Sequence, residues 1–287
     1  MTRTATGKRR ALRALLAAPE AVIAPSIGDP LSARMVEAAG LPAVHCSGSV
    51  LHNTLGYADG GLLTMTEMVA SITAICDAVD LPLIADADTG FGSAANVVRA
   101  VREYERSGAA AMHLEDQATP TRPAMIPGFA IRTVSKEEMV NKIKAAVDAR
   151  RDESFIIVAR SDVKGDYQEV LDRLAACLEA GADAAWLPPG RPEEMRSART
   201  ALGKPLIGVL QGTMTVKEFG ALANCALLPG SMQVAALYAQ RRFLESLQRT
   251  GSTREYFEQL PGVDEVRKFY GGTGVSWLLE VDRKYSA

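Results

Sequence analysis

Four acidic side chains of the sequence follow short apolar runs and could together bind a cation. Asp86 and Asp88 end one such run, and Glu115 and Asp116 end the next. Asp86 and Asp88 are two residues apart, so in an extended chain their side chains point to the same face. Two carboxylates that close repel each other unless a cation compensates their charge or the pKa of one rises. This spacing therefore makes a cation site a specific hypothesis.

The residue types also indicate which cation would bind. Hard oxygen ligands without paired histidines favour Mg²⁺, with Mn²⁺ as the alternative, over zinc. Because Mg²⁺ keeps several waters, we expect one or two of the acids to bind it directly and the others to hold those waters. The sequence leaves a second interpretation open, in which Asp88 and Asp116 only cap the helices that follow them.

Two further groups could hold an anion beside such a cation. Ser47-Gly48-Ser49 follows an apolar run and supplies backbone N–H groups and hydroxyls, which suit a carboxylate or a phosphate. Arg160 closes another apolar run, and its guanidinium can grip a carboxylate through two hydrogen bonds. The alternatives are an ordinary turn at the serines and an ion pair of Arg160 with Glu115 or Asp116.

These residues must be positioned by the apolar runs, which are typical of buried parallel strands. Helical segments lie between most of the runs, and several helices end in a glycine directly before the next strand, as at Gly40. The eight runs are 21–24, 43–46, 83–85, 111–114, 155–159, 184–187, 206–209 and 226–228. This repeat predicts an α/β fold, a (β/α)₈ TIM-type barrel with its site at the carboxyl ends of the strands. An open, doubly wound sheet is the alternative, and the eighth strand disfavours it.

The composition fits one folded domain and excludes several functional classes. The chain has 287 residues, 47% hydrophobic and 23% charged, and its 32 Lys+Arg and 34 Asp+Glu give a net charge of −2. There is no basic surplus for nucleic acid and no apolar run long enough for a membrane span. The four cysteines are widely spaced in apolar surroundings, which is typical of a reducing compartment. We therefore expect a cytoplasmic protein that binds neither nucleic acid nor membranes.

We expect one α/β-barrel domain over residues 1–287. The barrel should occupy about 20–250, and a helical extension about 251–287. The segment 233–248 has the periodicity of one long helix, and no linker or charge block divides the chain.

Longer motifs around the candidate residues resemble the isocitrate lyase/phosphoenolpyruvate mutase superfamily. They are Asp-Ala-Asp-Thr-Gly-Phe-Gly at 86–92, His-Leu-Glu-Asp-Gln at 113–117, Ala-Arg-Ser-Asp at 159–162 and Ala-Gly-Ala-Asp at 180–183. The resemblance spans about 12–247, most of the chain. It implies a barrel whose last helix is exchanged between subunits, so we expect a homo-oligomer, either a dimer or a tetramer, that acts on a small carboxylic acid. The alternative is a monomer that folds its own last helix over the bottom of the barrel.

The resemblance also implies roles for individual residues. The acids that match Asp86 and Asp88 bind Mg²⁺, and those that match Asp59 and Glu115 lie in its outer coordination sphere. The groups that match Ser47 and Gly48, with Ser49 beside them, and Arg160 hold the 2-oxo acid or its enolate. Members of this superfamily make or break a C–C or P–C bond next to a 2-oxo acid.

The sequence departs from the lyase branch in the loop after the Glu-Asp-Gln segment. The catalytic cysteine of that branch falls on Pro123, its lysine on Thr121 and its histidine on Met125, whereas Arg122 matches. We expect the loop 118–133 to act as a lid, with Thr121 and Arg122 as its catalytic polar groups beside Arg160.

Two further polar groups of the lyases are also absent. Pro188 or Pro189 replaces a glutamate after the sixth strand, and Val209 or Leu210 replaces an asparagine after the seventh. Because these groups would receive the extra carboxylates of isocitrate or methylisocitrate, we expect a smaller or more hydrophobic substituent on the substrate.

These expectations combine into one predicted function and its alternatives. We predict a Mg²⁺-dependent carbon–carbon lyase or decarboxylase acting on a small 2-oxo or 2-hydroxy carboxylic acid through a metal-stabilised, pyruvate-like enolate. The alternatives are a phosphonopyruvate-type P–C bond hydrolase or mutase, and a descendant that has kept the fold without activity.

Overall fold

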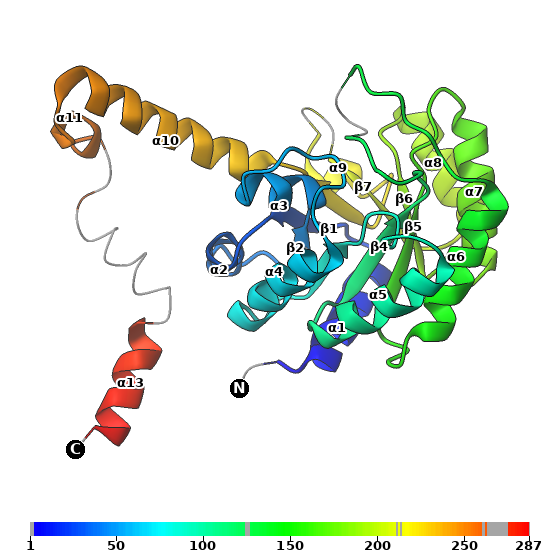
Figure 1. The fold of residues 1–287 in the computed structure, drawn as a ribbon, viewed down its shortest axis with the longest axis horizontal. Coiled ribbons are helices and arrows are strands. Elements are labelled where there is room, and N and C mark those ends of the chain that lie inside the picture. Colours follow the sequence, from blue (N-terminus) through cyan, green and yellow to red (C-terminus); the bar gives the residue numbers. More distant parts are fainter. Residues whose placement is uncertain are drawn as a thin grey trace. The chain divides into compact units, whose positions relative to one another are not determined.

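A closed barrel of eight parallel strands forms the centre of the protein (Figure 1). The computed structural model describes residues 3–123, 127–210, 212, 214–259, 262 and 275–286. The chain forms two compact units, Met1–Gly230 and Ser231–Ala287. The barrel lies wholly in the first unit, while the expectation of a single domain remains a prediction.

The strands pair in sequence order around the ring, and β1 closes it against β8. They are β1 (Val22–Ile27), β2 (Val44–Cys46), β3 (Leu83–Asp86), β4 (Ala111–Glu115), β5 (Ile156–Arg160), β6 (Ala184–Leu187), β7 (Leu206–Val209) and β8 (Cys225–Leu228). Each strand overlaps one of the eight predicted apolar runs. The (β/α)₈ prediction is therefore confirmed, and the open sheet is excluded.

Helices follow the strands and surround the barrel (Figure 1). They are α2 (Pro30–Ala38), α3 (Gly48–Thr54), α4 (Met65–Ala78), α5 (Ala94–Arg106), α6 (Lys136–Ala149), α7 (Tyr167–Glu179), α8 (Pro192–Leu202) and α9 (Val216–Phe219). Local signals fix several of their starts. Asp29 caps α2 directly before Pro30, and Thr64 with Glu67 forms a reciprocal capping box at α4.

The amino-terminal end of the barrel is covered by α1 (Ala5–Ala17), which precedes β1. Leu12 and Leu16 of this helix are buried in the same apolar cluster as Val22, Ala110 and Ile156, which lie at or next to strand starts. Burying side chains of this size contributes roughly 1.5–3 kcal/mol each. Because α1 covers this end, the carboxyl ends of the strands form the other, open end.

The second unit contains α10 (Ser231–Thr250), α11 (Arg254–Phe257) and α13 (Ser276–Tyr285). The helix predicted over 233–248 lies within α10. No residue of α10 is buried, and Val234, Leu237, Tyr238 and Leu244 are exposed. Among the described residues, no helix is long and apolar enough to cross a membrane.

Candidate active site

The predicted anion-binding and metal-binding residues lie at the carboxyl ends of β2 to β5. Ser47 follows β2, Asp86 ends β3, Glu115 ends β4 and Arg160 ends β5. Strand register brings the last two together, since Glu115 and Arg160 are directly paired across β4 and β5. The barrel therefore places these side chains at one mouth, as the sequence predicted.

Asp86 is buried and held from several sides. Its Oδ2 accepts a hydrogen bond from the Gly48 backbone N–H at 2.9 Å, and its Oδ1 accepts one from the Asp88 N–H at 3.0 Å. His113 Nδ1 lies 3.6 Å from the same Oδ1. Burial raises the pKa of Asp86, but His113, Arg160 and the Gly48 N–H outweigh it, so the pKa is lowered. Asp86 is therefore a fixed, ionised carboxylate.

In contrast to Asp86, Asp88 has a raised pKa. Burial raises its pKa to about 8, and the negative charges of Asp86 and Asp59 act in the same direction. Its backbone is left-handed, with φ of 45°, which is uncommon for a residue other than glycine. The structure thus holds a second carboxyl group in a strained position where negative charge is already concentrated.

The two aspartates converge beside Gly48. A Cβ built on this glycine would lie 2.9 Å from Asp86 Oδ2 and 3.6 Å from Asp88 Oδ1. Only a residue without a side chain leaves room for both carboxylates there. Two carboxylate oxygen donors around one small space fit a hard divalent cation.

No group of three or more His, Cys, Asp or Glu side chains within the described ranges is arranged to hold a metal by itself. The number of direct ligands stays a prediction; Mg²⁺ in proteins commonly completes its shell with water and substrate oxygens.

Arg160 is bound by two carboxylates. Its Nε and Nη2 donate to Asp162 Oδ1 and Oδ2 at 3.0 and 2.9 Å, and Nη1 lies 3.1 Å from Glu115 Oε2. The guanidinium also lies over the Trp186 ring, 5.0 Å from its centroid. Of the five N–H groups of an arginine, these contacts leave two for a ligand.

Glu115 is buried at 4% exposure and keeps a raised pKa. Burial is the main cause, and the charges of Asp162, Asp88 and Asp86 add to it, while Arg160 acts against it. Its backbone N–H donates to the Asp88 carbonyl at 2.9 Å, which ties the ends of β3 and β4 together. Glu115 thus connects the aspartate pair with Arg160.

Asp59 also belongs to the electrostatic environment of this mouth. Burial raises its pKa, and so does the charge of Asp86, whereas a side-chain hydrogen bond with Ser49 lowers it. Two of the residues predicted for different roles, Asp59 and Ser49, are therefore partners of each other.

The sequence predicted that the backbone N–H groups and hydroxyls of the loop after β2 bind an anion, but one of these N–H groups already has a partner. The N–H of Gly48 is already donated to Asp86, while the Ser47 hydroxyl makes no capping hydrogen bond to α3. Ser47 is buried at 6% exposure. Its hydroxyl is therefore the better placed of these two groups to meet a ligand in this conformation.

The predicted lid is attached to the site through Gln117. The Gln117 side chain accepts from Arg122 N–H at 2.8 Å and donates to the Arg122 carbonyl and to Asp162 Oδ2, at 3.0 and 2.7 Å. Backbone hydrogen bonds from Ala118 to Arg132 and from Val134 to Asp116 close the base of the loop. The lid thus shares Asp162 with Arg160.

The two predicted lid residues lie at its start. Thr121 is buried, and a Cβ built on Gly61 would lie 3.0 Å from its hydroxyl. The Arg122 guanidinium donates to the Thr121 carbonyl at 2.7 Å. Met125, which matches the histidine of the lyase branch, lies outside the described residues. The catalytic roles of Thr121 and Arg122 remain predictions.

The sequence left open whether Arg160 pairs with Glu115 or with Asp116. The ion pair of Arg160 with Glu115 is confirmed. Asp116 instead accepts hydrogen bonds from Ser161 and lies 3.3 Å from Arg173. Neighbouring residues of a strand point to opposite faces, so Asp116 points away from the side of the barrel that Glu115 occupies.

The sequence interpretation missed Asp162, Trp186 and Tyr104. Asp162 lies two residues after Arg160, and this spacing of one strand period could have indicated that the two side chains meet. Trp186 comes from β6, and Tyr104 donates from α5 to the Asp86 carbonyl at 2.8 Å. No local pattern relates these two residues to the site.

Comparisons with known proteins agree with this geometry. Residues 12–247 match the family model described as phosphoenolpyruvate phosphomutase. The chain is 39% identical over 287 residues to 2,3-dimethylmalate lyase of Eubacterium barkeri, covering 96% of this chain and 97% of that protein.

Two solved structures have the same fold. A complex of oxaloacetate acetylhydrolase with 3,3-difluorooxalacetate has a TM-score of 0.88 at 30% identity, covering 97% of each chain. A complex of phosphonopyruvate hydrolase with oxalate and Mg²⁺ has a TM-score of 0.86 at 30% identity, covering 100% of each chain. These similar proteins act on small carboxylic acids, as their names state.

Proposed function

The chain belongs to the phosphoenolpyruvate phosphomutase family and is a carbon–carbon lyase of small carboxylic acids, and we propose that it splits an alkyl-substituted 2-hydroxy dicarboxylic acid of the malate type. The bond between C2 and C3 would break, which gives a 2-oxo acid and a saturated carboxylic acid. The convergence of Asp86 and Asp88 beside Gly48, next to Arg160, is the observation that supports a metal-dependent reaction here.

An alkyl substituent is supported by the residues that replace the polar groups of the isocitrate-cleaving branch. Pro188 or Pro189 follows β6, Val209 or Leu210 lies at the end of β7, and Pro123 lies in the predicted lid. None of these side chains offers a charge or a hydrogen bond to an additional carboxylate. The similarity to an enzyme named for 2,3-dimethylmalate, which carries methyl groups instead, agrees with this difference.

We propose Mg²⁺ as the cofactor of this divalent-metal site, with Mn²⁺ as the alternative. Asp86 and Asp88 would hold it, and Asp59 and Glu115 would hold its waters. When bound, the cation supplies Lewis-acid stabilisation of the negative charge that develops on substrate oxygens.

The protein's own groups would bind and orient the substrate. The two remaining N–H groups of Arg160 and the Ser47 hydroxyl would hold the carboxylate at C1. Asp162 and Trp186 would keep the guanidinium in place. As the C2–C3 bond breaks, the C2 hydroxyl would give its proton to a carboxylate of the site, and its oxygen would become the carbonyl oxygen of the 2-oxo acid. The electron pair of the broken bond would pass to C3 and spread into the adjacent carboxylate, and C3 would then take up a proton on the side covered by Thr121 and Arg122.

An assay with a panel of substrates tests the proposal. The full chain with Mg²⁺ should release pyruvate from 2-methyl-substituted malates faster than from methylisocitrate, oxaloacetate or phosphonopyruvate, and a chelator should stop the reaction. Asp86→Asn should remove turnover, whereas Asp77→Asn, an exposed carboxylate on α4, should not.

Other outcomes would contradict the proposal. Release of phosphate from phosphonopyruvate as the fastest reaction would favour the P–C bond alternative. Absence of turnover for the whole panel, together with absence of oxalate binding in the presence of Mg²⁺, would favour a protein that has kept only the fold.

We further propose that the working form is a homo-oligomer in the cytoplasm. The exposed apolar side chains of α10 support the first point, and four buried, unpaired cysteines support the second. Analytical ultracentrifugation should give a dimer or tetramer, and a monomer at micromolar concentration would contradict this.

A further inference from the structure

A cavity of about 880 Å³ opens at the amino-terminal end of the barrel, away from the active-site mouth. Its walls come from α1, from the last turns of α5 and from the loop between α6 and β5. All three segments precede strands, which places the cavity at the end opposite Asp86 and Arg160. A volume of this size accommodates a small molecule.

The cavity walls carry an excess of positive charge. Six arginines line the cavity, against three carboxylate side chains. The arginines are Arg9, Arg10, Arg13, Arg102, Arg106 and Arg151. Since the whole chain has a net charge of −2, this concentration is a local feature and does not follow from the composition.

Half of these arginines have their charge compensated. Arg9 lies 2.8 Å from Asp152, Arg13 lies 2.8 Å from Asp183, and Arg106 lies 2.6 Å from Glu103. Arg10, Arg102 and Arg151 are exposed and form no ion pair with any residue of the ranges that the structure describes. Three uncompensated guanidinium groups thus face one space from three different segments.

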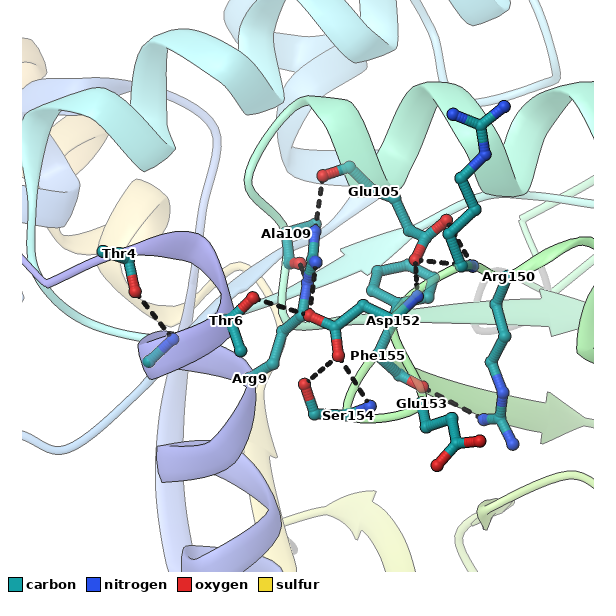
Figure 2. A network of polar contacts seen from close by, with 12 residues as sticks. Thr4, Thr6, Arg9, Glu105, Ala109, Arg150, Asp152, Glu153, Ser154 and Phe155 are labelled. Carbon is teal, nitrogen blue, oxygen red and sulfur yellow. Dashed lines mark hydrogen bonds and ion pairs between the residues drawn. The ribbon is translucent and has the colours of Figure 1, made fainter.

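Two of the three cavity carboxylates, Glu105 and Asp152, are held by other partners, whereas Glu153 is exposed and forms no ion pair within the described ranges, so one carboxylate faces the three free arginines. Glu105 is buried, and its carboxylate accepts the backbone N–H groups of Arg151 and Asp152 at 2.9–3.1 Å. Asp152 is occupied by Arg9, Thr6 and Ser154 (Figure 2).

The same hydrogen bonds make the cavity wall rigid. Figure 2 shows Arg9 reaching from α1 toward the carbonyls of Glu105 and Ala109 and toward the Asp152 carboxylate. Glu105 holds the backbone of the turn that carries Arg151. Because the wall is fixed before any ligand arrives, binding would require little reordering of the backbone.

We propose that this cavity binds a small polyanion that carries at least two phosphate groups. Guanidinium groups bind phosphate oxygens through paired hydrogen bonds, and three of them spaced around one cavity suit a chain of linked phosphates better than a single carboxylate. The ligand would compensate the charges of Arg10, Arg102 and Arg151 and would occupy a site separate from the active site.

Isothermal titration calorimetry with inorganic tripolyphosphate tests this inference. The full chain, in metal-free buffer at low ionic strength, should bind one tripolyphosphate per chain. The double variant Arg102→Gln/Arg151→Gln should bind at least tenfold more weakly. Its thermal unfolding should match that of the unmodified chain, because neither side chain forms an ion pair within the described ranges.

The matched control is Arg99→Gln/Arg196→Gln, which removes two exposed arginines outside the cavity, one of them on α5 itself. This variant should bind like the unmodified chain. Equal weakening by both double variants would show unspecific attraction and would overturn the proposal, as would absence of binding. A tricarboxylate that binds as tightly as tripolyphosphate would overturn the assignment to phosphate.

Discussion

At the residue scale, Gly48 is important because the Asp86 carboxylate lies directly against it. Its N–H donates to Asp86 Oδ2, and the same oxygen occupies the region where a side chain would begin. A Cβ contact of 2.9 Å is too short to persist, so the Asp86 carboxylate would have to move in a Gly48→Ala variant.

We expect Gly48→Ala to weaken Mg²⁺ binding by at least tenfold, or about 1.4 kcal/mol, and to lower turnover by a similar factor. Titration calorimetry with Mg²⁺ measures the first effect. Gly60→Ala is the matched control, because a Cβ on Gly60 would meet no atom within 4 Å. Equal affinities of the two variants would show that the approach of Asp86 to Gly48 has no role in metal binding.

Arg160 combines charge with a fixed planar shape. Its bidentate contact with Asp162 sets the direction of the guanidinium, which a lysine ammonium cannot reproduce. Arg160→Lys should therefore raise KM for the substrate by about tenfold to a hundredfold, with a smaller change in kcat. Steady-state kinetics provides the measurement.

The control for this variant is Arg150→Lys, which alters an arginine that pairs with Asp183 at the opposite end of the barrel. Its KM should remain unchanged. If Arg160→Lys keeps the KM of the unmodified enzyme, Arg160 does not hold the substrate carboxylate.

At the scale of elements, the predicted lid is positioned by the side chain of Gln117, two residues after the end of β4. Gln117 binds both backbone groups of Arg122 and also Asp162, so it fixes the start of the loop relative to β5. Gln117→Ala should lower kcat and make the loop 118–133 more sensitive to proteolysis, because three hydrogen bonds that restrain it are lost.

The variant Thr121→Ala distinguishes a catalytic role of the loop 118–133 from the role of Gln117 in holding that loop in place. The Thr121 side chain is not part of the Gln117 contacts, so this variant should lower turnover while the rate of proteolysis stays unchanged. A loss of turnover in the Gln117 variant without faster proteolysis would contradict the anchoring role.

At the scale of the whole molecule, buried histidines link stability to pH. His45 and His113 are at most 1% exposed inside the barrel, with their Nε2 atoms 3.1 Å apart. Burial lowers the pKa of His45 to about 3 and that of His113 to about 4, and in His45 the neighbouring His113 adds to this effect.

Lowered histidine pKa values mean that the unfolded chain binds more protons between pH 6.5 and 4. The free energy of unfolding should therefore be highest above pH 6.5 and should fall on acidification, by about 2 kcal/mol per histidine between pH 7 and pH 5. Urea unfolding at pH 7 and pH 5 measures this change. The decrease in the free energy of unfolding should be about 2 kcal/mol smaller for His45→Gln than for the unmodified chain. An equal decrease in both proteins would contradict the neutral state of His45.

The sequence alone determined the architecture and the positions where chemistry would be found. Eight apolar runs separated by helices are local patterns, and their periodicity depends on each residue's neighbours in the chain. Asp86, Glu115 and Arg160 could be placed at one mouth because the carboxyl ends of parallel strands meet there. The approach of Asp86 and Asp88 does not follow from strand spacing, because β3 ends at Asp86 and Asp88 has a left-handed backbone.

Tertiary structure decided which partner each charge has. Glu115 rather than Asp116 pairs with Arg160, Trp186 supports the guanidinium from β6, and Gly48 gives its N–H to Asp86. These contacts join residues from different strands or loops, so they depend on strand register and on the paths of loops in three dimensions. Sequence spacing carries no information about strand register or about the paths of loops. The arginine-lined cavity at the other end of the barrel could not be predicted either, because its walls come from three segments far apart in the chain.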